Sequence, residues 1–380
     1  MQRFMRRIII ILVVLVALCY FCLIFFYQDE DSKYLDTVDA ITVANDYIYS
    51  VGLNNNNDRN LEKAKYTMYD MSQEKVMEKI YNKGYSSRFY DLVSDDGDVV
   101  IVGSYEATKK DHKNNLDTAL ILKYSDDGQV LFEKDLDMKN SSFRHIVKTS
   151  DGYIAVGTGK EENSQRGIIV KYHRDGTVDW KKAFDQKKDV LFSSAVVYDD
   201  TIYVVGVQNH HGILASFDMK GNNIDYVIDK TTDSFGYSSL AVVDDTVVVT
   251  TGRKENDIFS PTLVQYDLDL SYLDDVSYAT EYSGRFHTIL KDSNNDLIVL
   301  GEVIEHTNKK EIHSSYIGKY RSDLTEAEVV PYYNDGDNYF TDVCLVDDAY
   351  LVSGYSYYSK EGYLGKLLVY SKALKMLEVK

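Results

Sequence analysis

Chemically versatile side chains recur along this 380-residue chain, each time one or two positions after an apolar residue. They are Asp39, Tyr90, Asp91, Arg144, His145, Ser193, Ser194, Ser238, Ser239, His287, Thr288, Thr341 and Asp342. The carboxylates and imidazoles of this set could bind a ligand through charged hydrogen bonds, or could transfer protons as general acids and bases. Either role requires that the fold bring these side chains together.

Two further motifs resemble metal sites but lack part of the ligand set. His210 and His211 are adjacent, so their side chains diverge, and the sequence places no third ligand beside them. The stretch from Asp292 to Asp296 resembles the start of a calcium loop, without the glycine and the distal glutamate of such a loop. We expect ordinary turns at both places, and therefore no metal site.

A three-part pattern repeats seven times between residues 38 and 380. In each unit an apolar residue opens a first predicted strand, a glycine closes the second, and an aromatic residue lies in the third. The opening residues are Val38, Phe89, Phe143, Phe192, Tyr237, Phe286 and Phe340. The glycines are Gly52, Gly103, Gly157, Gly206, Gly252, Gly301 and Gly354. The aromatic residues are Tyr69, Tyr124, Tyr172, Phe217, Tyr266, Tyr320 and Tyr370. One such unit cannot bury a core alone, so the units must pack side by side.

Four short strands per unit, seven times over, predict an all-β fold, a seven-bladed β-propeller of four-stranded antiparallel blades over residues 38–380. Middle strands such as Val99–Val102 are apolar on both faces, as expected between neighbouring blades. We expect blade seven to be built from the C-terminal end, with no N-terminal strand unless residues 33–36 pair at its edge. In this fold the polar residues that follow each opening residue would surround one mouth of the central channel.

The N-terminus predicts a membrane anchor. Residues 8–27 carry no charge, and 20 helical residues rising about 1.5 Å each match the roughly 30 Å hydrocarbon layer. Arginines at positions 3, 6 and 7 precede this run, and acids at positions 29 to 31 follow it. We therefore expect a cytoplasmic stub (1–7), a transmembrane helix (8–27), a linker (28–37) and a propeller outside the cell membrane. The alternative is a cleaved signal peptide.

Charge and cysteine content narrow the function classes. The chain has a formal net charge of −18, which argues against nucleic acid as a partner because a phosphate backbone needs a basic surface. Cys19 and Cys22 lie in the apolar run and Cys344 stands alone, so we expect no disulfide framework. The stability of the domain must then come from packing.

The stretch from Tyr172 to Trp180, in which Asp175 and Gly176 precede Trp180, looks like an Asp-x-Gly-x-x-x-Trp turn and outer strand. It resembles the repeats of pyrroloquinoline-quinone-type bacterial surface propellers, and the array over residues 38–380 is similar to degenerate members of that group. Trp180 is the only tryptophan, whereas the quinone-binding dehydrogenases carry a ring of docking tryptophans. The resemblance therefore implies the fold, with no cofactor and no active site.

The sequence favours a membrane-anchored extracellular binding or scaffolding module over an enzyme. The predicted ligand-binding residues are Asp39, Tyr90, Asp91, Arg144, His145, His287 and Asp342. The expected partner is a protein, a polysaccharide or a small cationic or polar ligand, because the acids would select such groups. The alternative is a propeller-fold hydrolase or lyase whose acids and histidines sit at the channel mouth.

Overall fold

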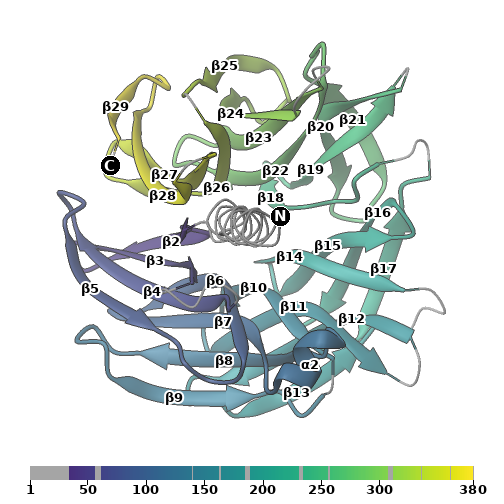
Figure 1. The fold of residues 1–380 in the computed structure, drawn as a ribbon. Helices are drawn as coiled ribbons and strands as arrows, with labels where there is room; N and C mark the ends of the chain where they lie inside the picture. The colour runs from purple at the N-terminus through teal and green to yellow at the C-terminus, as the bar shows by residue number, and fades with distance from the viewer. Residues whose placement is uncertain are drawn as a thin grey trace, which may run out of the picture.

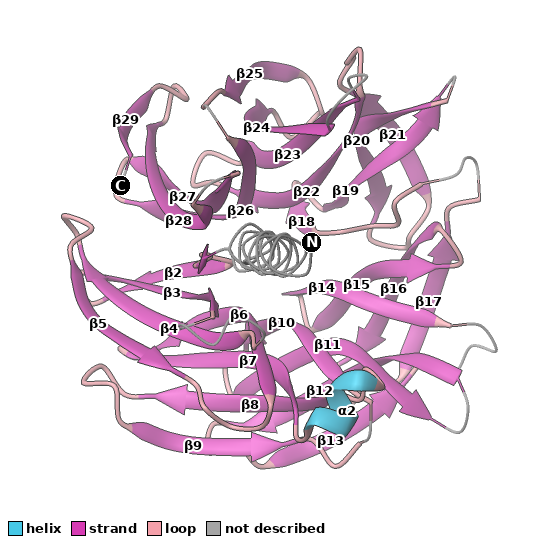
Figure 2. Cartoon of the chain, in the orientation of Figure 1, coloured by secondary structure: helices cyan, strands magenta, loops and turns pink. Residues whose placement is uncertain are grey.

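The computed structural model describes residues 34–55, 61–138, 140–161, 164–184, 189–230, 234–255, 257–306, 311–334, 336–359 and 361–379. It confirms the all-β, seven-bladed propeller of four-stranded antiparallel blades (Figure 1). Figure 2 shows strands throughout, with one short helix, α2 (Lys109–Lys113), among the described residues. The helix predicted for residues 8–27 lies outside these residues. No helix in the described part of the chain is long and apolar enough to cross a membrane.

Each blade is a consecutive run of strands, ordered from the central channel outward. Blade one is β2 (Ala40–Ala44), β3 (Tyr47–Asn54), β4 (Lys63–Asp70) and β5 (Lys75–Ile80). Blade two is β6 (Ser86–Asp95), β7 (Asp98–Glu106), β8 (Thr118–Tyr124) and β9 (Val130–Asp135). Blade three is β10 (Ser142–Lys148), β11 (Gly152–Glu161), β12 (Ser164–His173) and β13 (Val178–Ala183). Blade four is β14 (Val190–Tyr198), β15 (Thr201–Gln208), β16 (His211–Asp218) and β17 (Asn223–Ile228).

The last three blades repeat this order. Blade five is β18 (Leu240–Val243), β19 (Thr246–Glu255), β20 (Ile258–Asp267) and β21 (Tyr272–Ser277). Blade six is β22 (Ser283–Lys291), β23 (Leu297–His306), β24 (Glu311–Tyr320) and β25 (Glu326–Tyr332). Blade seven is β26 (Asp337–Val346), β27 (Ala349–Tyr358), β28 (Gly362–Ser371) and β29 (Met376–Val379).

The ring closes between blades seven and one. All four strands of blade seven come from the C-terminal end, as expected, and β29 pairs with the second half of β28. The first half of β28 pairs in parallel with β1 (Tyr34–Leu35), so the N-terminal segment does pair at this edge. The predicted linker, residues 28–37, therefore contains a two-residue strand.

A β-bulge follows the opening aromatic residue in five of the seven first strands. In blade two, Phe89 pairs with Gly103 and Asp91 pairs with Val102, which leaves Tyr90 unpaired between them. A bulge bends the strand and turns the extra side chain in a new direction. A Cβ on Gly103 would collide with the carbonyl oxygen of Arg88, which explains the need for glycine at this place.

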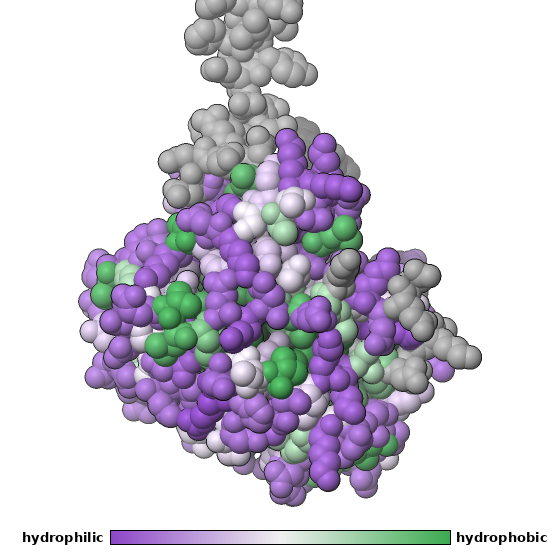
Figure 3. Space-filling view, turned by 90° about the horizontal axis from the view of Figure 1, so that it is seen from below, coloured by the Kyte–Doolittle hydropathy of each residue, from purple (hydrophilic) through white to green (hydrophobic). Residues whose placement is uncertain are grey.

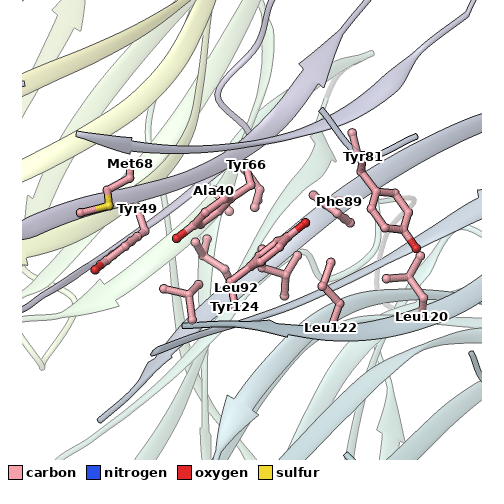
Figure 4. Packing of buried hydrophobic residues seen from close by; sticks show 14 residues of the cluster. Ala40, Tyr49, Tyr66, Met68, Tyr81, Phe89, Leu92, Leu120, Leu122 and Tyr124 are labelled. Carbon is pink, nitrogen blue, oxygen red and sulfur yellow. The ribbon is translucent and has the colours of Figure 1, made fainter. Parts of the chain in front are cut away.

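The hydrophobic core consists of separate clusters, one between each pair of neighbouring blades. Between blades one and two, Tyr49 and Tyr66 stack at 6.2 Å and Tyr66 and Tyr124 at 4.8 Å between ring centroids (Figure 4). The outside is mainly hydrophilic on the face shown in Figure 3, with small separate apolar patches. Among the described residues, the cluster between blades seven and one is the smallest, with Val38, Ile41, Ile48, Leu351 and Leu367 buried.

A second contact between neighbouring blades lies at the outer strands. One position in the outermost strand faces one residue in the outer turn of the next blade, and that turn residue has a positive φ. Between blades three and four these residues are Trp180 and Gly221, and the indole Nε1 donates to the carbonyl oxygen of Met219 at 3.1 Å. Met77 with Gly128 and Phe132 with Gly176 repeat the arrangement at the two earlier blade pairs.

The next three blade pairs use the reverse combination. The outer-strand position holds Asp225, Asp274 or Glu328. The turn of the following blade holds Leu270, Leu324 or Leu374, each buried and each with a positive φ. At each of these six blade pairs, one large side chain is therefore present, either on the outermost strand of one blade or in the outer turn of the next. The space between the blades is filled in both cases.

We expect Gly221→Leu to destabilise the domain by about 1–3 kcal/mol, because its Cβ would lie 2.7 Å from the Trp180 ring. The double variant Trp180→Asp with Gly221→Leu gives this blade pair the residue combination that Asp225 and Leu270 form at the equivalent positions of the next pair, so part of that loss should return. Denaturant midpoints of the four proteins give the coupling energy, which we expect within about 0.5–3 kcal/mol. Additive single effects would contradict this pairing.

Candidate functional site

A cavity of about 720 Å³ lies at one mouth of the central channel. Every blade contributes to its wall the residue that directly follows the opening apolar residue. These residues are Asp39, Tyr90, Arg144, Ser193, Ser238, His287 and Thr341. Five of the seven are the unpaired residues of the β-bulges, so the bulge is the local feature that directs their side chains into the cavity.

Four predicted ligand-binding residues, Asp39, Tyr90, Arg144 and His287, therefore line one cavity. The other three predicted residues lie one position further along the first strand. They are Asp91, His145 and Asp342, and none of them belongs to the cavity wall.

These three side chains hold neighbouring blades together. Asp91 accepts a hydrogen bond from the backbone N–H of Ile146 in the next blade at 2.8 Å. Asp342 accepts the N–H of Ile41 at 2.9 Å, and so joins blade seven to blade one. His145 Nδ1 accepts the N–H of Ala195 in blade four at 3.4 Å. The bulge explains the difference from the sequence-based expectation, because it sends consecutive side chains to different places.

Burial controls the charge of Asp91, Asp342 and His145. It raises the pKa of Asp91 to about 7, and burial together with the charge of Asp91 raises the pKa of Asp342 to about 7. Burial lowers the pKa of His145 to about 4, so the imidazole is neutral at physiological pH. Its Nε2 lies 3.6 Å from Asp91 Oδ2.

Several residues that the sequence did not single out complete the cavity. Thr37, Arg88, Leu191, Arg285 and Tyr339 stand directly before an opening residue and also line it. Side chains alternate along a strand, so the residues on either side of a buried one share a direction. That rule, applied before as well as after each opening residue, would have found this set.

Two of the three arginines in the cavity have carboxylate partners. Arg88 Nη2 lies 2.6 Å from Glu62 Oε2, and Arg285 Nε donates to Glu302 Oε1 at 2.7 Å. Burial opposes ionisation of Glu302, but His313 and Arg285 outweigh it and lower its pKa to about 2. Glu302 is therefore ionised, and each of these two arginines has a carboxylate beside it.

Arg144 differs from these two. Its guanidinium lies over the Tyr90 ring, 4.0 Å from the ring centroid, in cation–π geometry. No ion pair joins Arg144 to any described residue, and its buried Nε has no hydrogen-bond partner among them. Burial lowers the pKa of His287 to about 4, so that imidazole adds no positive charge. Burial also raises the pKa of Asp39 to about 6, which leaves this carboxyl partly protonated in mildly acidic solution.

Tyrosines from blade seven form the opposite wall. Tyr339 and Tyr355 stack with 4.9 Å between centroids and 26° between planes. Tyr363 meets Tyr355 edge-on, at 5.7 Å and 72°. All three line the cavity and are half-buried. A wall of this kind offers both an apolar ring surface and phenol hydroxyls.

A smaller pocket of about 140 Å³ adjoins the cavity and shares Glu62, Arg88 and Tyr90 with it. It extends toward the segment that carries α2, where His112 Nδ1 lies 2.6 Å from Glu106 Oε2.

The two metal-like motifs form turns. The carboxylate of Asp292 accepts the backbone N–H groups of Asn294 and Asp296 and the hydroxyl of Tyr350, as a structural turn residue does. His210 lies in the tight turn between β15 and β16 with a positive φ. Among the described residues there is no group of three side chains that could hold a metal ion.

No family model and no curated protein matches the sequence. Solved structures share the fold, and the three examples that follow have TM-scores of 0.51 to 0.58 against this chain. The propeller domain of the Trilobed protease from Pyrococcus furiosus is 10% identical, with a TM-score of 0.51 over 91% of this chain and 96% of that one. A prolyl endopeptidase is 10% identical with a TM-score of 0.54, covering 92% and 51%. A puromycin hydrolase is 9% identical with a TM-score of 0.58, covering 92% and 55%.

These similarities support the β-propeller fold, and the cavity at the channel mouth is a feature of this chain's own structure. The chain spans about half the length of the prolyl endopeptidase and the puromycin hydrolase. At 9–10% identity the likeness concerns the fold alone.

Proposed function

We propose that the protein is a membrane-anchored extracellular binding module that holds a polar ligand in the mouth cavity. The observation that carries this proposal is the wall of the cavity, to which every blade contributes one side chain at an equivalent position. Seven separate cores hold these positions in a rigid ring, and binding sites are commonly carried by such scaffolds.

The ligand would contact Asp39, Tyr90, Arg144 and His287 directly. Asp91, His145 and Asp342 would act beneath them by fixing the spacing of the blades. Suitable partners are a segment of another protein, a polysaccharide or a small polar molecule. A hydrolase or lyase remains the alternative function, supported by the Asp91–His145 contact and by two carboxyls whose pKa values lie near neutrality. Turnover of a bound oligosaccharide or peptide would favour it.

Filling the cavity tests the binding proposal. Ser193→Trp and Ser238→Trp place bulky rings in the wall of blades four and five without removing a charged group. The labelled full chain, in detergent, is applied to an array of neutral oligosaccharides, acidic oligosaccharides and peptides. We expect the wild-type protein to bind at least one probe and both variants to bind it at least about tenfold more weakly.

The matched control is Ile224→Trp on outer strand β17, where the side chain is 61% exposed. This variant should bind as the wild type does, and all three variants should keep the wild-type melting temperature within a few degrees. Undiminished binding by both cavity variants would show that the ligand docks elsewhere.

The membrane proposal has its own test. The arginines at positions 3, 6 and 7 precede residues 8–27, which favours a cytoplasmic N-terminus and an external propeller. Protease added to intact cells should therefore remove an epitope at the C-terminus and leave one at the N-terminus. Loss of the N-terminal epitope alone would reverse the topology. Protection of both would place the propeller inside the cell.

We also propose kinship with the pyrroloquinoline-quinone-type bacterial propellers. The support is the docking of Trp180 onto the turn at Gly221, with Met77 and Phe132 at the same position of the two preceding blades. The chain would then retain the docking contact with other side chains in place of most tryptophans.

A further inference from the structure

We propose that the mouth cavity selects an acidic saccharide, a sugar ring whose carboxylate is bound by Arg144 and whose face lies against the tyrosines of blade seven. This inference rests on the proposed function, since it names the ligand class of the same cavity. It reverses the cationic preference expected from the sequence, because two of the acids on which that expectation relied bind backbone N–H groups outside the cavity wall.

The ion pairing of the arginines in the cavity carries the first step. Arg88 is paired with Glu62, and Arg285 with Glu302. Arg144 has no ion-pair partner among the described residues, although it is half-buried against Tyr90. Of the three arginines in the cavity it is the one whose charge is left for a ligand.

The geometry of Arg144 carries the second step. A guanidinium binds a carboxylate through two parallel N–H donors, one of which is Nε on its side edge. The Nε of Arg144 is buried and has no acceptor among the described residues. An acceptor such as a planar carboxylate on this edge would satisfy the buried donor, whereas an ammonium group, which only donates, would not.

The third step of the inference concerns the tyrosine wall. It explains why the cavity would prefer a sugar carboxylate to a carboxylate on another kind of molecule. A pyranose ring has an apolar C–H face and a polar edge, which fits aromatic rings that also present hydroxyls. Tyr339, Tyr355 and Tyr363 provide such surfaces at different angles to one another. The volume of about 720 Å³ is within the usual range for ligand pockets.

Calorimetric titration of the full chain in detergent tests this with matched probes. Trigalacturonate and the equivalent neutral galactose trisaccharide differ in the carboxylates alone. A tripeptide with a free C-terminal carboxylate provides a second source of the same anion. We expect trigalacturonate to bind at least about tenfold more tightly than either of the other probes.

Arg144→Met should weaken trigalacturonate about ten- to a hundredfold and weaken any binding of the neutral sugar by a clearly smaller factor. Arg144→Lys should recover only part of the loss, because lysine keeps the charge without the two-donor fork. Arg174→Met, an exposed arginine 3.0 Å from Asp96, is the control and should have no effect. Unchanged melting temperatures would exclude unfolding as the cause.

Equal binding of the acidic and neutral sugars, tighter binding of the peptide, or no binding of trigalacturonate would overturn the inference. So would an equal loss from Arg144→Met and Arg174→Met. If Ser193→Trp abolishes binding of the neutral sugar or the peptide while Arg144→Met does not, the cavity is the binding site and the acidic saccharide is the wrong ligand.

Discussion

Phe143→Ala should lower the free energy of unfolding by about 3–5 kcal/mol, among the largest effects of any single substitution in the protein. Phe143 is fully buried between blades two and three, where its ring meets Tyr172 edge-on at 6.1 Å. Its removal leaves a cavity that rigid strands on both sides cannot fill. The same residue precedes the bulge that directs Arg144 into the mouth, so ligand binding should weaken as well.

Denaturant titration followed by circular dichroism measures this loss, and Ile224→Ala on the exposed outer strand is the control, with an expected change of less than about 0.5 kcal/mol. A comparable effect from both substitutions would mean that the contacts between blades do not dominate stability.

Asp91→Asn should remove much of the pH dependence of stability. The folded pKa of Asp91, about 7, lies above the ordinary value of about 4. Between these values the folded protein holds a proton that the unfolded chain has lost. The contribution of Asp91 is therefore fully present below about pH 4 and is lost as the pH rises through 7.

Relative to Asp91→Asn, the wild-type protein should lose on the order of 3 kcal/mol of stability between pH 4 and pH 8. The asparagine retains an acceptor for the N–H of Ile146, and it also removes the charge that raises the pKa of Asp342. His145 is present in both proteins, so its opposite trend largely cancels. Denaturant midpoints at four pH values test this, with Asp126→Asn as the control. Parallel curves for wild type and Asp91→Asn would refute it.

The sequence was sufficient for the fold because three independent markers shared one spacing. Blade two is an example. Its first strand, next to the channel, contains Phe89, two backbones approach closely at Gly103, and the buried third strand contains Tyr124, as the spacing predicts. These features depend on local patterns that a single chain displays.

The cavity was only partly predictable. A bulge inserts one residue into a strand and changes the direction of the side chains that follow. The residue types of Tyr90 and Asp91 do not predict this bulge. Arg88 and Glu62 are 26 positions apart and lie in neighbouring blades, so their pairing could not be predicted from the sequence. For the same reason the sequence could not show that Arg144, unlike Arg88, has no ion-pair partner among the described residues. The pKa values depend on burial, which also arises only in the ring.

The position of the cavity has a thermodynamic consequence. Its wall includes Leu35 and Asp39 from the start of the ring and Thr341 and Tyr363 from the end, so an occupant touches both sides of the joint where the ring closes. The buried cluster at this joint is the smallest among the described residues. Occupancy and closure are therefore linked equilibria: a ligand at 100 times its Kd would stabilise the closed ring by about 2.7 kcal/mol. By the same linkage, any change that loosens the joint would weaken the binding of the ligand.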